Sequence, residues 1–284
     1  MPAYESLAPI DADIVVSAGH VEMVASDRAD TTVEVTPTHP GRSGDIALAR
    51  QATVTFEDNR LRVRVPGRLK MLGPGRDSVD VRIELPAGSR AGIEAGYGSV
   101  RVTGELGTTR IVAKYGNVSA ERVGDLALVS PYGEVDVAEV GGELDVKVAH
   151  GHVRIGRIAG PARLRGAHGT LTLGTTESEV DVATSGPLTI ERSLADVTAQ
   201  TAYGAIRVLA AEGGILRLES TYKDVEVGVP AGVSAWVDAA SAHGAVRNEL
   251  TPGPEAAATD RRIELHLRAN WADVLLRRAA PRSA

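Results

Sequence analysis

Apolar and polar residues alternate along most of this chain in short runs. In "LALVS" at 126–130 and in "EVDV" at 134–137, an apolar or small side chain occupies every second position. Because successive side chains of a β-strand point to opposite faces, this alternation predicts strands with one buried face. Pairs of such runs recur without a helical period between them, so we expect an all-β chain.

A short motif marks the break between the two runs of each repeat. It consists of an aromatic residue or histidine, then in most copies glycine, and then an aliphatic residue two positions later, with Ser185 in the first position of one copy. Copies recur about every 18 residues, a period typical of repeat folds. Glycine suits a corner, where a Cβ would obstruct the backbone. The residues expected to stack as one corner ladder are Tyr97, Tyr115, Tyr132, His150, His168, Tyr203, Tyr222, His243 and Trp271.

Two strands per period, each paired with its counterpart one period away, describe a single-stranded parallel β-helix, or β-solenoid. Equivalent side chains would then lie about 4.8 Å apart on successive coils of about 18 residues. Right-handed winding is expected, because connections between parallel strands are nearly always right-handed. The aliphatic residues would form ladders inside the coils.

The pattern divides the chain into three parts. "EDNR" at 57–60 joins two alternating runs and predicts a hairpin turn, and the Gly- and Pro-rich stretches 37–45 and 66–77 are expected to be loops. Because the ends of a β-solenoid expose strand edges, the first part is expected to cover one end with antiparallel strands. The parts are an N-terminal β cap region at 1–78 that is continuous with the solenoid, the solenoid at 79–278 and a disordered tail at 279–284.

One internal echo supports this division. "IELPAGSRAGIEAGYGSV" at 83–100 resembles "VEVGVPAGVSAWVDAASAHGAV" at 225–246. Both segments read as a strand, a Pro-Ala-Gly turn, a second strand and then the corner motif. The repeated order predicts two similar turns at distant positions in the fold.

Composition narrows the classes of protein and of partner. The chain has 284 residues, 3% aromatic residues, no cysteine and a net charge of −6, and its charges form no basic stripe. We therefore expect a core of Val, Leu, Ile and Ala, no disulfide and no nucleic-acid partner. The N-terminal residues lack a leader pattern and no apolar run is long enough to span a membrane, so we expect no membrane insertion and a cytoplasmic location.

Three histidines in "AHGHVRIGRIAGPARLRGAHGT" form a candidate site. His150 and His168 are expected about 5 Å apart on adjacent coils, with His152 near the same corner, so their imidazoles could share a zinc-type ion. In the alternative interpretation, His150 and His168 replace tyrosine in the structural ladder. The second interpretation is favoured, because the spacing follows from the repeat itself, and we expect no cofactor.

No sequence motif indicates catalysis. The glycines recur with the repeat and do not form a phosphate-binding loop, and no nucleophile elbow or metalloprotease motif is present. The stacked tyrosines could offer a flat strip to a sugar or an extended peptide, or they could only seal a corner. Outward-facing positions carry mixed charges and are expected to be solvated: Arg101, Ser119, Asp136, Arg154, Thr172, Thr189, Arg207, Glu226 and Arg247.

The serial Y/H-G-x-V motifs, the "LPAG" segment and the closing "ANWADVLLRR" resemble the "putative adhesin" family of bacterial β-strand-repeat proteins, a domain of unknown function. The resemblance covers nearly the whole chain, most clearly 79–278. It implies a β-helical fold and provides no catalytic or ligand-binding residues.

The expected function is that of a non-enzymatic, adhesin-like binding or scaffold protein. Its partner would be a protein or a glycan, and the chain would be a monomer or a small homo-oligomer. Two alternatives stay open: a structural element that assembles with itself through its strand edges, and a β-helical enzyme acting on carbohydrates.

Overall fold

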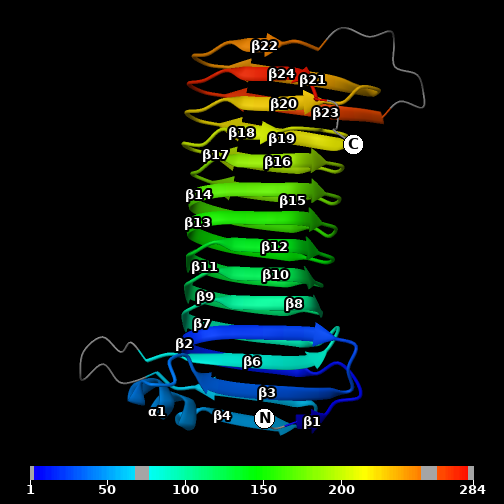
Figure 1. Ribbon diagram of the computed structural model, residues 1–284. Helices are drawn as coiled ribbons and strands as arrows, with labels where there is room; N and C mark the ends of the chain where they lie inside the picture. The colour runs from blue at the N-terminus through cyan, green and yellow to red at the C-terminus, as the bar shows by residue number, and fades with distance from the viewer. Residues whose placement is uncertain (1–2, 68–76, 251–260, 281–284) are drawn as a thin grey trace. The chain divides into compact units, whose positions relative to one another are not determined.

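The computed structural model describes residues 3–67, 77–250 and 261–280 (Figure 1). The chain forms two compact units, 1–142 and 143–284. Each contains a mostly parallel β-sheet, and the N-terminal unit adds antiparallel strands and one helix. The expected all-β class therefore holds apart from this helix. Among the described residues, no helix is long and apolar enough to cross a membrane.

The described residues of the N-terminal unit form twelve strands and one helix. They are β1 (Ala3–Glu5), β2 (Asp11–Ser26), β3 (Asp30–Pro37), α1 (Ser43–Gln51), β4 (Thr53–Glu57), β5 (Arg60–Val65), β6 (Val79–Pro86), β7 (Arg90–Tyr97), β8 (Val100–Leu106), β9 (Thr109–Tyr115), β10 (Val118–Val123), β11 (Leu126–Tyr132) and β12 (Val135–Val140).

The C-terminal unit consists of strands only, as far as it is described. They are β13 (Leu144–Ile158), β14 (Ala162–Thr176), β15 (Val180–Thr184), β16 (Leu188–Ser193), β17 (Val197–Thr201), β18 (Ile206–Val208), β19 (Gly214–Ser220), β20 (Val225–Val229), β21 (Val233–Ser241), β22 (Val246–Asn248), β23 (Arg261–Ala269) and β24 (Val274–Arg278).

Strands in the N-terminal unit pair in two parallel sets. One set contains β7, β9 and β11, the other contains β8, β10 and β12, and one strand of each set makes what we call a rung. The register stacks Val63, Ile14, Ile93, Ile111 and Leu128 in one row, and each of these side chains is at most 1% exposed. The alternating pattern thus places one aliphatic face of every strand inside the unit, where burial stabilises it.

Corner glycines allow successive rungs to approach closely. Gly98, Gly116 and Gly133 have φ values of 130°, 145° and 135°. A Cβ at these positions would lie 1.8–2.1 Å from the carbonyl oxygen of the corner glycine on the neighbouring rung. Both the left-handed backbone and the contact require glycine, which explains why it follows the aromatic residue of the motif.

The first long strand of the chain lies inside the parallel sheet. The first half of β2 pairs with β5 on one side and β7 on the other, and its second half pairs with β6 and β8, always in parallel (Figure 1). Strand β2 therefore forms a complete rung between two rungs that come later in the sequence. The segment 1–78 was expected to be a β cap region continuous with the solenoid, and β2 is the part of it that lies in the parallel sheet as an interior rung.

Antiparallel strands cover the next rung, as expected from the sequence. β3 pairs with β6 and with β1, and β4 pairs with β5. The β4–β5 hairpin turns at Asp58 and Asn59, whose φ values of 49° and 61° fit a type I′ turn. The predicted loop at 37–45 was partly wrong, because α1 begins at Ser43 inside it. Of the other predicted loop, 66–77, residues 68–76 lie outside the described residues.

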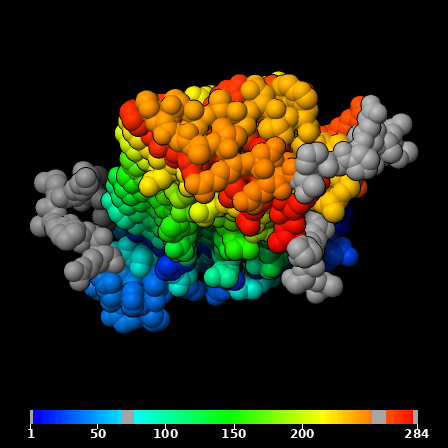
Figure 2. All heavy atoms as spheres, turned by 90° about the horizontal axis from the view of Figure 1, so that it is seen from above, coloured from blue at the N-terminus to red at the C-terminus, as the bar shows by residue number. Residues whose placement is uncertain are grey.

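The C-terminal unit repeats the same two-set arrangement, with a rearranged end. β23 pairs with β19 on one side and β21 on the other, and β24 pairs likewise with β20 and β22. The last rung of the chain thus lies between the two rungs that precede it in sequence. Simple serial stacking was expected here and is wrong. In Figure 2 the orange atoms of β21 and β22 lie on the face turned toward the viewer.

The two Pro-Ala-Gly turns make these insertions possible. In "PAGS" at 86–89 and in "PAGV" at 230–233, the amide of the fourth residue donates to the proline carbonyl at 3.4 Å. Gly88 and Gly232 both have a φ of 76°, which a type II turn requires at its third position. The first turn links β6 to β7 past the rung of β2, and the second links β20 to β21 past the rung of β23 and β24. The sequence echo therefore marks where the chain skips a rung.

Candidate functional site

The motif tyrosines of the N-terminal unit form a stack outside the core. The ring centroids of Tyr97 and Tyr115 are 4.9 Å apart and those of Tyr115 and Tyr132 are 5.2 Å apart, with interplanar angles of 5° and 4°. The corner glycines set this geometry by holding successive rungs in register. Tyr115 and Tyr132 are 47% and 46% exposed, whereas Tyr97, whose neighbour in β2 is Ala18, is 63% exposed. The stack thus presents ring edges and hydroxyls, and its end at Tyr97 presents a ring face.

The ladder of the C-terminal unit consists of separate pairs. His150 stacks on His168 at 5.3 Å, Tyr203 on Tyr222 at 5.3 Å, and Trp271 on His243 at 3.8 Å. Because the last rung is inserted, Trp271 lies between Tyr222 and His243 in the ladder. In the sequence, by contrast, Trp271 follows both residues.

Ser185 interrupts this ladder between His168 and Tyr203. The Tyr203 amide donates to the Ser185 carbonyl at 3.0 Å, which places the two residues on adjacent rungs. Tyr203 is 65% exposed, compared with 48% for Tyr222, because a serine covers less of the neighbouring ring than tyrosine does. The break therefore leaves one face of Tyr203 open to solvent.

The three candidate metal ligands are only partly brought together. His150 pairs in register with His168, while His152 pairs with Thr170 on the neighbouring strand. All three histidines are exposed. Within the part of the chain that is described, no group of three or more His, Asp or Glu side chains is arranged to hold a metal ion. The stacked rings place His150 and His168 in the ladder position that tyrosine holds elsewhere.

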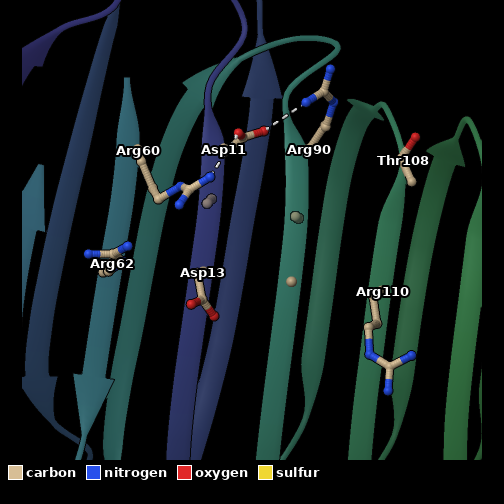
Figure 3. A pocket seen from close by; sticks show the side chains of 10 residues that line it. Asp11, Asp13, Arg60, Arg62, Arg90, Thr108 and Arg110 are labelled. Carbon is tan, nitrogen blue, oxygen red and sulfur yellow. Dashed lines mark hydrogen bonds and ion pairs between the residues drawn. The ribbon is translucent and has the colours of Figure 1, made fainter. Parts of the chain in front are cut away.

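A second surface feature was not predicted from the sequence. It is a shallow depression of about 310 Å³ on the sheet face formed by β5, β2, β7 and β9 (Figure 3). Its charged and hydroxyl-bearing lining residues are Asp11, Asp13, Arg60, Arg62, Arg90, Thr108 and Arg110. Four arginines face two aspartates there, giving a local charge of +2 on a chain whose net charge is −6.

Some of these charges are already paired. Asp11 lies 3.7 Å from Arg60 and 3.4 Å from Arg90, on opposite neighbouring strands. Asp13 accepts a hydrogen bond from Arg64 at 2.5 Å. The guanidinium of Arg64 also donates to the Asp13 carbonyl at 3.0 Å, which draws this arginine toward β2. Two aspartates are therefore shared among three arginines.

Sequence reasoning missed the depression because its strands are not consecutive. The "RLRVRV" run of β5 shows a row of outward-facing arginines, and this was the one available signal. Its neighbours come from residues 11–13, 90–92 and 108–110, which meet only because β2 is inserted beside β7. No local pattern specifies that juxtaposition.

A buried carboxylate lies at the start of α1. The Asp45 side chain is 0% exposed, and its Oδ2 accepts a hydrogen bond from the His39 amide at 3.0 Å and lies 2.9 Å from the Nδ1 of His39. Its Oδ1 accepts from the Ser78 amide at 3.1 Å. Burial opposes ionisation, but these hydrogen bonds outweigh it, so the pKa of Asp45 lies below its usual value. Asp45 thereby ties α1 to the segment that enters β6.

No family model matches the chain, and no curated protein matches its sequence. Among solved structures, the chain is similar to a putative adhesin from Parabacteroides distasonis, with 15% identity, a TM-score of 0.40 and 96% of each chain covered. It is also similar to a putative adhesin from Bacteroides fragilis, with 9% identity, a TM-score of 0.27, and 97% of this chain and 95% of that chain covered.

A third similar structure is a putative cell adhesion protein from Clostridium sporogenes. Its identity is 9% and its TM-score is 0.23, with 98% of this chain and 99% of that chain covered. The resemblance to putative adhesins stated from the sequence thus has counterparts among solved structures. At these identities and TM-scores, no function of this chain is drawn from them.

Proposed function

We propose that this chain is a non-enzymatic, adhesin-like binding or scaffold protein. Its two strand sets would wind as a right-handed parallel β-solenoid with about 18 residues per coil. Register offsets such as Tyr97 to Tyr115 and Tyr115 to Tyr132 support this winding. A cytoplasmic location remains a prediction from the sequence.

The exposed tyrosine stack is the observation that carries the proposal. The chain has few aromatic residues, yet five of its six tyrosines occupy the motif position outside an aliphatic core. Side chains placed there contribute little to core packing and are accessible to a partner. Tyrosine is favoured at binding surfaces because it supplies a large contact area with few rotatable bonds. A rigid row of such rings is suited to recognition.

Two carboxylates with shifted pKa values, Glu84 and Asp238, lie in ion pairs and are not candidates for a general acid or base. The carboxylate of Glu84 has a lowered pKa because Arg28 and Arg82 donate hydrogen bonds to it. The pKa of Asp238 is lowered in the same way by Arg268. Such ion pairs hold each group in its charged form, whereas a general acid or base needs a pKa near the working pH.

Binding of the tyrosine stack can be tested with paired variants. The wild-type chain and a Tyr97→Ser/Tyr115→Ser double variant are compared on a glycan array and by cross-linking in native lysate. The matched control is Leu209→Ser, which removes an exposed apolar side chain (42% exposed) from another position. We expect a ligand that the control retains and the double variant loses. A wild-type chain with no ligand, or one whose ligands survive in the double variant, contradicts the proposal.

Self-assembly is the second candidate, because one sheet edge favours it. β21 and β22 pair with β23 and β24 on one side, and no other described strand pairs with them. Open strand edges can pair with another chain. A sedimentation coefficient that rises with protein concentration supports this alternative, and a single monomeric species over a wide concentration range contradicts it.

A further inference from the structure

We propose that the arginine-lined depression over Gly92 binds an acidic polysaccharide through its sulfate or carboxylate groups. This site lies on the face of the β5–β2–β7–β9 sheet and does not include the tyrosine stack (Figure 3). The proposal therefore stands or fails independently of the function proposed above.

Two arginines there are available for a ligand. Arg62 and Arg110 are exposed, and neither forms an ion pair with any residue in the described ranges. Arg110 lies in register between Gly92 and Ala127, so no long side chain flanks it in its own row. An unpaired guanidinium presents its N–H fork to solvent, in the geometry that sulfate and carboxylate groups accept.

Gly92 forms the floor of the depression. Along one row of the sheet the residues are Arg62, Asp13, Gly92 and Arg110, on four adjacent strands. The Gly92 backbone has ordinary extended geometry, and a Cβ there would come no closer than 3.9 Å to any neighbour. No steric need for glycine is evident at this position. Its effect is to leave the space between Asp13 and Arg110 open.

The distance between Arg62 and Arg110, the two arginines here without an ion-pair partner among the described residues, sets a minimum size for the ligand. Arg62 and Arg110 lie three strand intervals apart, which is about 14 Å. One small anion cannot bridge that distance, so a ligand that uses both arginines must carry at least two anionic groups. In the neighbouring row of the sheet, Arg60 and Arg90 share the single carboxylate of Asp11, which leaves further positive charge beside this row.

The chemistry of this face favours a polysaccharide over other polyanions. β2 and β7 are paired on both sides, so their backbones offer no free edge to an extended peptide. Among the described residues, no aromatic side chain lines the depression, so they offer no stacking platform of the kind typical of single-strand nucleic-acid binding. Recognition must then depend on anionic groups placed over an open floor, which a sulfated or uronate polymer supplies.

The test is a calorimetric titration of the full chain with heparin, polygalacturonate, single-stranded DNA, neutral dextran and inorganic sulfate. We expect heparin or polygalacturonate to bind, with an affinity that falls as salt is added. Arg62→Gln and Arg110→Gln should each weaken binding about threefold to tenfold. Arg217→Gln, which removes an exposed arginine of β19, is the matched control and should leave binding unchanged.

A variant at the floor separates loss of binding from loss of folding. Gly92→Asp places a carboxylate among the arginines and should abolish binding, while Gly92→Asn adds the same volume without charge and should weaken it less. Thermal melts of both variants check that each is folded. Tighter binding of DNA or sulfate than of the polysaccharides, or equal losses in Arg110→Gln and Arg217→Gln, would overturn the proposal.

Discussion

In the N-terminal unit the outermost parallel rung is covered by antiparallel strands, whereas in the C-terminal unit no described strand covers it. Both units insert a terminal rung between two others, and both use a Pro-Ala-Gly turn to skip it. Only β5 and β6 then receive antiparallel partners, β4 and β3. Insertion of a rung therefore does not by itself end a parallel sheet. A reversal of strand direction does, because the next repeat can no longer continue the same ladder.

The comparison also shows what insertion achieves. A strand at the end of a parallel stack has one unpaired edge, but β2 and β23 have partners on both sides although they lie near the chain termini. Terminal segments of most domains fray because few contacts hold them. Placing them between neighbours converts them into core elements and moves the exposed edge to β21 and β22, which lie further from the C-terminus in sequence.

The largest expected effect concerns the inserted rungs. Leu267→Ala and Ile14→Ala each remove a fully buried side chain from an inserted strand, and each should lower the free energy of unfolding by about 2–5 kcal/mol. Val246→Ala on the outer rung, where the side chain is 43% exposed, is the control and should lose about 0.5 kcal/mol or less.

Denaturant unfolding provides the measurement for these three variants. Trp236 and Trp271, the two tryptophans of the chain, both lie in the C-terminal unit, so fluorescence follows that unit while circular dichroism follows both. If Leu267→Ala lowered the free energy of unfolding no more than Val246→Ala does, the inserted rung would be no more stabilising than the outer rung. The contrast between inserted and outer rungs would then be wrong.

A smaller effect concerns the cap of the N-terminal unit. Among the described residues, Asp45 is the one charged side chain that is fully buried. Asp45→Asn should lower stability by about 1–3 kcal/mol at neutral pH, because the amide cannot accept as many hydrogen bonds as the carboxylate. Asp136→Asn, at an exposed position of β12, is the control and should change stability by less than about 0.5 kcal/mol.

The pH dependence of that effect has a defined sign. Because the pKa of Asp45 is lowered by folding, its ionised form contributes stability that is complete above the unfolded pKa of about 3.9. That contribution is lost as pH falls through the lower, folded pKa. Urea titrations between neutral pH and pH 3 should show a smaller acid loss in Asp45→Asn than in the wild type. An identical acid loss in both would show that another group controls the acid response.

The smallest effect compares the two ladders. Ser185→Tyr should fill the break next to Tyr203 and stabilise the C-terminal unit by about 0.5–1.5 kcal/mol, whereas Tyr115→Ser should break the N-terminal stack and destabilise it by a similar amount. Ser119→Tyr makes the same substitution on an outer strand face away from the ladder. Thermal melts compare the three, and equal gains in Ser185→Tyr and Ser119→Tyr would assign the effect to strand propensity and not to stacking.

Local sequence patterns predicted many of the strands and turns but not the order in which the strands pair. The alternation and the corner glycines anticipated the parallel strands from β7 onward, the β4–β5 hairpin and the two similar Pro-Ala-Gly turns. They did not anticipate α1, because Gly44 and the neighbouring polar residues resemble a loop and the helix depends on the buried Asp45. The local patterns also did not predict which strands pair with β2, because an alternating strand can pair equally well with many others.

By itself, the sequence determined the period, the buried face of each strand and the residues at the corners, because these follow from side-chain spacing and from the space a Cβ requires. Only the tertiary structure decided the order of the rungs. That order placed Trp271 before His243 and brought Asp13, Gly92 and Arg110 into one row. The reason is physical: equivalent aliphatic strands compete for the same neighbours, and long-range packing, which no local stretch encodes, selects among them.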